Sequence, residues 1–106
     1  MSNTFTADYM ERLLIRAADI IKSANITVSG QTDNYPITLT VIENNFYKHY
    51  FEMGSEPIGI IERVEAVDEN GIVMWEKDYE IDKDDNGWHI AVKASIVLVD
   101  DEGESE

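Results

Sequence analysis

The sequence predicts an α+β fold in which an N-terminal helix packs on an antiparallel sheet of about five strands that ends in a three-stranded meander. Three observations predict it: an apolar stripe of helical period in residues 7–24, β-branched runs after residue 25, and two Asn-Gly pairs between alternating runs. A chain of 106 residues supplies one modest core, so we expect a single domain over residues 1–99. Residues 100–106 are acidic and without periodicity, which predicts a disordered tail.

The helix is expected from about Ala7 to Ala24. Apolar residues recur there at spacings of three and four, namely Met10, Leu13, Leu14, Ala17, Ile21 and Ala24. The hydroxyl of Thr6 can cap the first turn, and Asp8 lies four residues before Arg12 on the same side of the helix. The wide apolar face predicts that this helix covers a sheet.

The next segment reads as two strands, residues 26–30 and 37–43, joined by a loop at residues 31–36. Residues 44–54 are ambiguous, because Asn44 can cap a short helix while the aromatic residues that follow alternate like those of a strand. The interpretation slightly favours a helical turn there.

The Asn-Gly pairs at residues 70–71 and 86–87 each predict a hairpin, and together they predict the meander. If each pair forms the centre of its turn, the first hairpin places Asp78 opposite Arg63 and Glu76 opposite Glu65. The second places Glu80 opposite Lys93 and Asp84 opposite His89. In this register one face of the meander is apolar, and we expect the helix to pack on it: Ile60, Val64, Ala66, Trp75, Tyr79, Ile81, Ile90, Val92, Ala94, Ile96 and Leu98.

The net charge is −14, from 22 acidic and 8 basic residues, and residues 62–106 hold 15 of the acids but 4 of the bases. Such a field repels nucleic acid and anionic membranes, and it attracts cations and basic protein surfaces. The chain also has no basic start followed by an apolar core, and no apolar run near the roughly 18 residues of a membrane span. We therefore expect a soluble cytoplasmic protein that binds neither nucleic acid nor membrane directly.

Carboxylates occupy every second position of one predicted strand, a row that we call the acidic ladder: Glu76, Asp78, Glu80, Asp82 and Asp84. An extended strand projects such a row to one side at intervals of roughly 6.8 Å. That is near twice the ~3.4 Å advance per phosphate of a DNA strand, so the ladder can imitate a nucleic-acid backbone. Together with Glu65, these carboxylates are offset in the predicted register by Arg63 and Lys93 alone, which costs stability. An ordinary solvated sheet face stays open as the alternative.

The same segment contains half of a calcium-loop pattern, at Asp82, Asp84 and Asn86, followed by Gly87. The twelfth position of that pattern is Lys93 in place of a bidentate Glu, and the flanking segments are predicted strands. The segment is therefore interpreted first as a turn, with weak cation binding as the lesser alternative. No other metal site is expected.

Catalytic patterns are not found in this sequence. There is no Cys, no Gly-x-Ser-x-Gly motif and no phosphate-binding glycine pattern. His49 and His89 lie far apart in the chain, and a His89–Asp84 pair at an exposed turn would lack the shielded pocket that acid–base catalysis usually needs. We expect a protein that is not an enzyme and takes no cofactor.

The first functional hypothesis is a non-enzymatic interaction protein, in which the acidic ladder with Glu65 and a partly exposed Trp88 docks on a basic partner such as a nucleic-acid-binding enzyme. In small size, strong acidity and lack of a catalytic pattern, the chain resembles phage-encoded inhibitors that mimic nucleic acid, which implies an inhibitor. The helix-on-sheet arrangement is similar in general shape to the cystatin-like fold. One alternative is a viral or other assembly subunit that forms homo-oligomers through a sheet edge or the aromatic residues 46–51. The other is a weak cation-binding domain.

Overall fold

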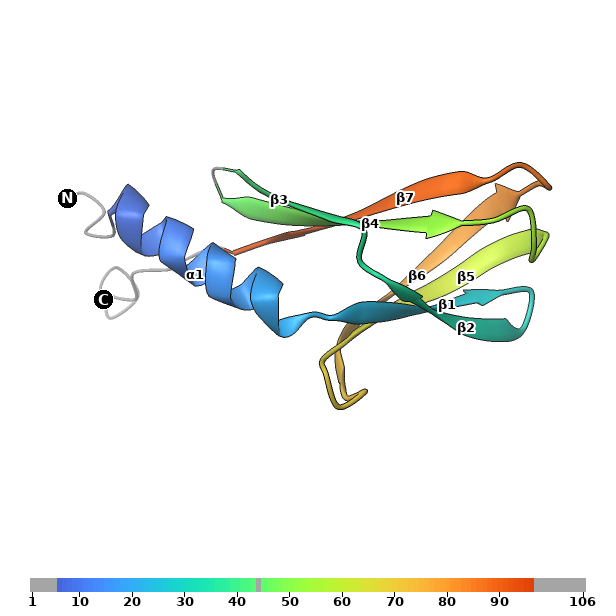
Figure 1. The fold of residues 1–106 in the computed structure, drawn as a ribbon, viewed down its shortest axis with the longest axis horizontal. Helices are drawn as coiled ribbons and strands as arrows, with labels where there is room; N and C mark the ends of the chain where they lie inside the picture. The colour runs from blue at the N-terminus through green and yellow to red at the C-terminus, as the bar shows by residue number, and fades with distance from the viewer. Residues whose placement is uncertain (1–5, 44, 97–106) are drawn as a thin grey trace, which may run out of the picture.

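The computed structural model describes residues 6–43 and 45–96, so the expected acidic tail at residues 100–106 lies outside the described residues. The fold is α+β, with one helix and antiparallel sheets, as predicted. Its elements are α1 (Ala7–Ile20), β1 (Ser23–Val28), β2 (Gln31–Pro36), β3 (Leu39–Glu43), β4 (Phe46–Met53), β5 (Gly59–Val67), β6 (Val73–Lys83) and β7 (Trp88–Ser95). In place of one sheet of about five strands, there are a four-stranded sheet, ordered β2-β1-β5-β6, and a three-stranded sheet, ordered β3-β4-β7 (Figure 1).

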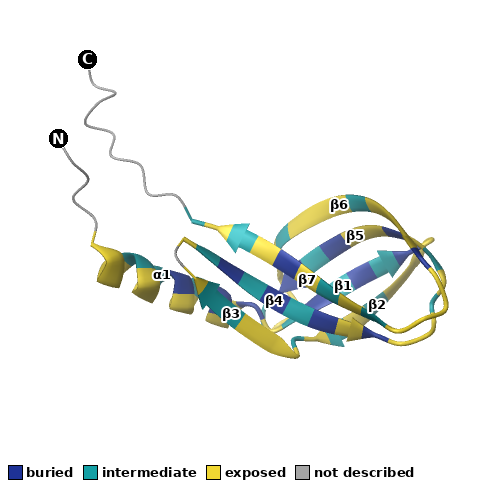
Figure 2. Cartoon of the chain, turned by 90° about the horizontal axis from the view of Figure 1, so that it is seen from above, coloured by how far each residue is buried: buried dark blue, intermediate teal, exposed yellow. Residues whose placement is uncertain are grey.

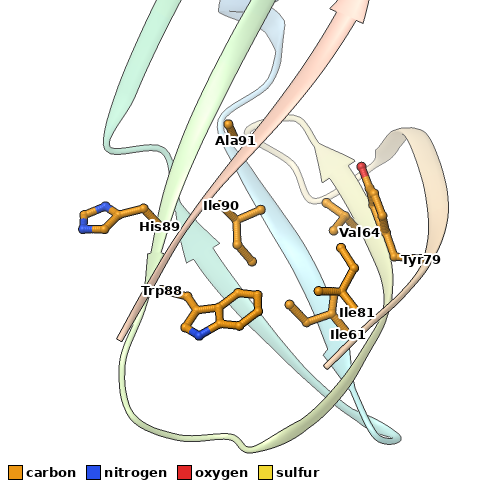
Figure 3. Close-up of a pocket in the computed structure, with 8 residues that line it drawn as sticks. All are labelled: Ile61, Val64, Tyr79, Ile81, Trp88, His89, Ile90 and Ala91. Atoms are coloured by element: carbon orange, nitrogen blue, oxygen red, sulfur yellow. The ribbon is translucent and has the colours of Figure 1, made fainter. Parts of the chain in front are cut away.

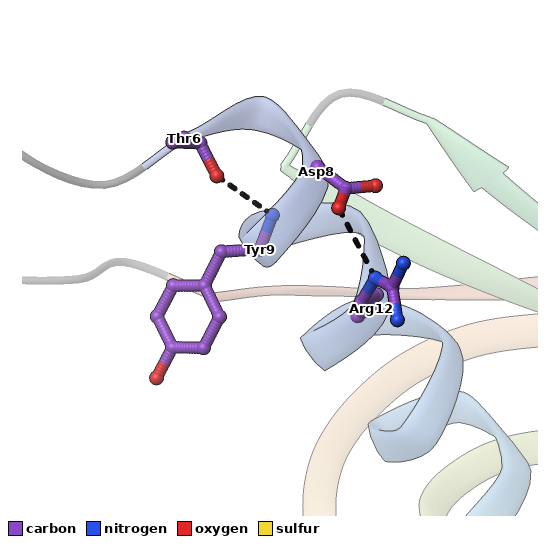
Figure 4. A network of polar contacts seen from close by, with 4 residues as sticks. All are labelled: Thr6, Asp8, Tyr9 and Arg12. Atoms are coloured by element: carbon purple, nitrogen blue, oxygen red, sulfur yellow. Dashed lines mark hydrogen bonds and ion pairs between the residues drawn. The ribbon is translucent and has the colours of Figure 1, made fainter.

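Helix α1 begins as the sequence predicts and ends earlier. The hydroxyl of Thr6 accepts the N–H of Tyr9 at 3.1 Å, and Arg12 Nε donates to Asp8 Oδ2 at 3.2 Å (Figure 4). The predicted end at Ala24 is wrong, because Ala24 belongs to β1, where it pairs with Ala66 of β5. Strand β1 buries every second residue, and this period of two replaces the helical period after Ile20.

Residues 31–36, expected to form a loop, are strand β2, which pairs along its whole length with β1. The connection is a two-residue turn of Ser29 and Gly30, which have φ values of +46° and +86°. Positive φ at both positions matches the right-handed twist of a hairpin. Strand β2 is an edge strand and largely exposed, which explains why its polar composition resembles that of a loop.

The predicted helical turn at residues 44–54 is also wrong, because residues 46–53 form the central strand of the three-stranded sheet. Tyr47, His49, Phe51 and Met53 are buried, while the residues between them face outward. Pairing to β3 on one side and β7 on the other satisfies the backbone of β4. The aromatic group is therefore divided between the core and the outer face.

The first predicted hairpin is confirmed. Strand β5 pairs with β6 in the expected register over residues 63–66, with Arg63 opposite Asp78 and Glu65 opposite Glu76. Residues 59–61 are one residue out of that register, and Ile60, for example, lies opposite Asp82 in place of Ile81. The turn is longer than the expected two residues, because Val67 pairs with Val73 and the carboxylate of Asp68 accepts the N–H of both Asn70 and Ile72 at 2.9 Å.

The second predicted hairpin does not form, because β7 crosses to the other sheet and pairs with β4, from Met53 opposite Trp88 onward. Lys83, which is 2 % exposed, lies at this crossing. Its ammonium donates to the carbonyl oxygens of Gly54 at 2.8 Å and Asp84 at 3.2 Å. The end of β6 is thereby tied to the end of β4, across the two sheets.

Buried residues form two clusters. The larger lies between the sheets and contains Ala24, Ile26, Val28, Phe51, Met53, Ile61, Val64 and Val92. The smaller joins Leu14 and Ala18 of the helix to Tyr47 of β4. The helix was expected to cover the meander, but it packs beside β3 and β4 at the end of the three-stranded sheet that projects beyond the other sheet (Figure 1).

His49 connects this helix to the sheet. It is 1 % exposed, and its Nε2 lies 3.1 Å from the carbonyl oxygen of Ala18 in the last turn of α1. The carbonyls of a last helical turn have no partner within the helix, so the ring N–H satisfies one of them. Burial lowers the pKa of His49 from its usual value, against the opposing effect of this hydrogen bond.

Replacing Gly59 by alanine should destabilise the protein by about 1–3 kcal/mol. Gly59 has a φ of +145°, and a Cβ there would collide with the side chain of Ser29, whose hydroxyl accepts the N–H of Ile60 at 2.9 Å. Gly54→Ala is the matched control, since a Cβ at Gly54 meets no atom within 4 Å. Urea denaturation should give a lower midpoint for Gly59→Ala alone, and equal midpoints would contradict this account.

The His49→Gln variant should be less sensitive to acid than the unmodified chain. Unfolded His49 takes up a proton near its usual pKa of 6.5, while the folded form stays neutral to lower pH, so its contribution to stability is lost as pH falls below about 6.5. Glutamine keeps an N–H donor for Ala18 and does not titrate. As the pH falls from about 7.5 to about 5, the unmodified chain should lose more of its unfolding free energy than the His49→Gln variant loses. A difference that is the same at both pH values would show that His49 does not titrate on unfolding.

Candidate interaction surface on strand β6

Four members of the acidic ladder lie on the outer face of β6, as the sequence predicts. Glu76, Asp78, Glu80 and Asp82 are all exposed, and they alternate with residues that point toward the space between the sheets. Strand β6 is the last strand of the four-stranded sheet, and Figure 2 shows it exposed over most of its length. Glu65, on the neighbouring strand β5, lies opposite Glu76 and extends the acidic surface.

Arg63 is the cation at the centre of this surface. Its Nε donates to Asp78 Oδ1 at 3.1 Å, in an exposed ion pair. The hydrogen bond to Asp78 raises the pKa of Arg63, and so do the charges of Asp78, Glu76 and Glu65. Glu80 and Asp82 form no ion pair within the described residues.

The second expected cation is elsewhere. Lys93 was predicted opposite Glu80, but it lies on β7 in the other sheet, opposite Lys48, with its ammonium 4.6 Å from the centre of the Phe46 ring. Because β7 crosses between the sheets, the acidic surface loses one of the two cations that the sequence placed beside it. Among the described residues of β5 and β6, Arg63 alone is ion-paired with a ladder carboxylate.

Asp84, the fifth member of the acidic ladder, belongs to the turn that follows β6. Its carboxylate accepts the N–H of Asn86 at 3.0 Å, the amide of the Asn86 side chain at 3.2 Å and the indole N–H of Trp88 at 3.1 Å. These bonds lower the pKa of Asp84. The bond from the backbone N–H of Asn86 has the largest effect, and the bond from the Trp88 indole has the next largest. Asp84 therefore shapes the crossing turn, while the other four carboxylates remain on the open face.

The half calcium loop does not form the hairpin turn that the sequence favoured: Asp82 belongs to β6, and Asp84 and Asn86 lie in the segment that leads to the other sheet. Two of its three ligand candidates are bonded to each other, because the Asp84 carboxylate holds both the backbone and the side chain of Asn86. Within residues 6–43 and 45–96, no group of three or more His, Asp or Glu side chains is arranged to hold a metal ion.

The expected pairing of His89 with Asp84 does not form. His89 lies opposite Glu52 of β4, with Nδ1 3.9 Å from Glu52 Oε2, and both side chains are largely exposed. This pair lies on the outer face of the three-stranded sheet, away from the acidic ladder. It has no shielded surroundings of the kind that favour acid–base chemistry.

The inner side of β6 borders an apolar cavity of about 210 Å³ between the two sheets. Tyr79 and Ile81 of β6 face Trp88 and Ile90 of β7 across it, whereas His89 points away (Figure 3). Trp88 is partly buried, as expected, and lies on the β7 side of this cavity. The cavity was not predicted from the sequence, because β6 and β7 were expected to be paired neighbours in one sheet. The apolar residues that line it do alternate along the two strands: Tyr79 and Ile81 on β6, and Trp88 and Ile90 on β7.

Comparison with protein-family models, with curated proteins and with solved structures finds no match for this chain. Within the described residues, no helix has the length and apolar character needed to cross a membrane.

Replacing Asp84 by alanine should lower the denaturation midpoint, because three donors in the crossing turn lose their acceptor. Asp82→Ala, two residues away on the exposed face, is the matched control and should leave the midpoint nearly unchanged. The depressed pKa of Asp84 means that its contribution is present above the unfolded pKa of 3.8 and is lost as pH falls through the folded value. Thermal denaturation near neutral pH measures the difference, and equal losses in the two variants would contradict a special role for Asp84.

Proposed function

We propose that this chain is a non-enzymatic interaction protein that binds a basic surface of a partner protein through the acidic face of β6. The observation that carries the proposal is the exposed row of Glu76, Asp78, Glu80 and Asp82, next to Glu65 and balanced by Arg63. A row of like charges raises the free energy of the folded state. Binding to a cationic partner would relieve that repulsion. A face that is only solvated has no need of such a row, so partner binding accounts for its presence.

The partner class that best fits the row is a protein that binds nucleic acid. Carboxylates on alternate residues of a strand are spaced roughly 6.8 Å apart, which approximates every second phosphate of a nucleic-acid strand. The pairing of β5 with β6 is irregular between Ile61 and Arg63, and such irregularities increase local twist. The row thus follows a twisted path, as a phosphate backbone does. A chain of this kind would inhibit by occupying the basic groove.

Neutralising the free carboxylates of the row should weaken partner binding about tenfold or more without unfolding the protein. The variant combines Glu76→Gln, Glu80→Gln and Asp82→Asn, and it spares Asp78, which holds Arg63. The measurement is capture of proteins from lysate by the immobilised chain at about 50 mM and about 500 mM salt, with identification by mass spectrometry. Partners should be retained at low salt, released at high salt and displaced by added duplex DNA.

The control variant has the same net charge but keeps the row. It combines Glu11→Gln, Glu43→Gln and Glu56→Gln, three exposed carboxylates that are not part of the acidic ladder. Partners lost by the first variant and kept by the second depend on the row itself. Equal capture by both variants, or capture that resists high salt, would show that the acidic row is an ordinary solvated face and would contradict the proposal.

A further inference from the structure

One edge of β6 has no strand beside it. The strand has 11 residues and pairs with β5 on one side, while β7, the next strand along the chain, belongs to the other sheet. Its other side therefore presents a row of backbone N–H and C=O groups without strand partners in the described structure. Such an edge is a template for an added strand, unless the protein protects it.

The inner side of this edge is apolar. Ile81 is 41 % exposed although it faces the space between the sheets, and it borders the 210 Å³ cavity together with Tyr79, Ile61 and Trp88 (Figure 3). An extended segment placed along β6 directs every second side chain to this side. Those side chains must be apolar to fill the cavity.

The outer side of the same edge is acidic. The remaining side chains of an added segment would lie beside Asp78, Glu80 and Asp82, within the roughly 4.5–5.5 Å that separates cross-strand neighbours. Like charges at this distance repel and opposite charges attract. The outward side chains of a fitting segment are therefore basic.

We propose that β6 binds an extended segment of a partner protein by strand addition, and that the segment alternates basic and apolar residues. This inference rests on the proposed function and specifies how the acidic face is used. A second copy of the chain does not fit, because pairing β6 with β6 would bring two rows of carboxylates together. Residues 97–106 of the chain itself carry five carboxylates and are excluded by the same repulsion.

The test uses the whole chain and a capped peptide of about seven residues that alternates valine and lysine, long enough to lie along residues 78–82. Three matched peptides accompany it: one N-methylated at every second residue, one with glutamate in place of lysine, and one with the same composition but with its lysines and valines in separate blocks. Affinity is measured by titration of a dye-labelled peptide at low salt. Amide hydrogen exchange of β6 is measured with and without peptide.

The alternating peptide should bind, and should bind about tenfold more weakly after N-methylation, because methyl groups remove the N–H donors of the added strand. The glutamate and block peptides should also bind at least tenfold more weakly. Exchange of the β6 amides at the free edge should slow in the complex. Neutralising Glu76, Glu80 and Asp82 should weaken binding, while the variant at Glu11, Glu43 and Glu56 should not.

Equal affinity for the N-methylated peptide or the block peptide would overturn strand addition and leave the acidic-surface proposal intact. Equal affinity of the two protein variants for the alternating peptide would overturn the charge match and, with it, the role of the acidic ladder. Absence of binding by the alternating peptide would overturn strand addition at β6.

Discussion

The buried ammonium of Lys83 lies at the point where the two sheets of the structure are joined. It donates to the carbonyl of Gly54 and so holds the end of β6 against the end of β4, at the point where the chain passes from one sheet to the other. Strand β7 begins at Trp88, directly after this point, and its first residue pairs with Met53 of β4. A charge removed from water must have its donors satisfied, so the position of Lys83 leaves little freedom in how the two sheets meet. The open edge of β6, the apolar cavity behind it and the division of charge all follow from this crossing.

The crossing also decides the electrostatic character of the two outer faces. Strand β7 takes Lys93 with it, and that ammonium lies near the Phe46 ring, beside Lys48. The acidic face of β6 keeps Arg63, whose bond to Asp78 leaves Glu80 and Asp82 without a cation. The molecule therefore presents an acidic face on one sheet and a face with cations on the other. Its net charge of −14 does not reveal this separation.

Several local signals were read correctly from the sequence. The cap at Thr6, the Arg63–Asp78 register and the outward row on β6 are examples, because side-chain alternation and turn chemistry act over a few residues. The second Asn-Gly turn looked like the first, yet a turn does not specify which sheet receives the next strand. That choice depends on long-range contacts such as the one between Lys83 and Gly54, and a lysine in a polar segment gives no sign that it will be buried. Strand β2 was missed because an edge strand carries polar residues, and β4 because its alternation competed with a plausible helix cap.

The position of helix α1 beside the sandwich has a consequence for cooperativity. The larger cluster lies between the sheets and contains no helical residue, whereas the helix contributes Leu14 and Ala18 to a separate, smaller cluster with Tyr47. Opening of the helix exposes the smaller cluster and the His49 ring but leaves the space between the sheets closed. The free energy of local opening is set by the apolar contacts that are lost, so we expect the two parts of the chain to open as distinct cooperative units. We therefore expect the two sheets, and with them the acidic face of β6, to stay folded when the helix opens.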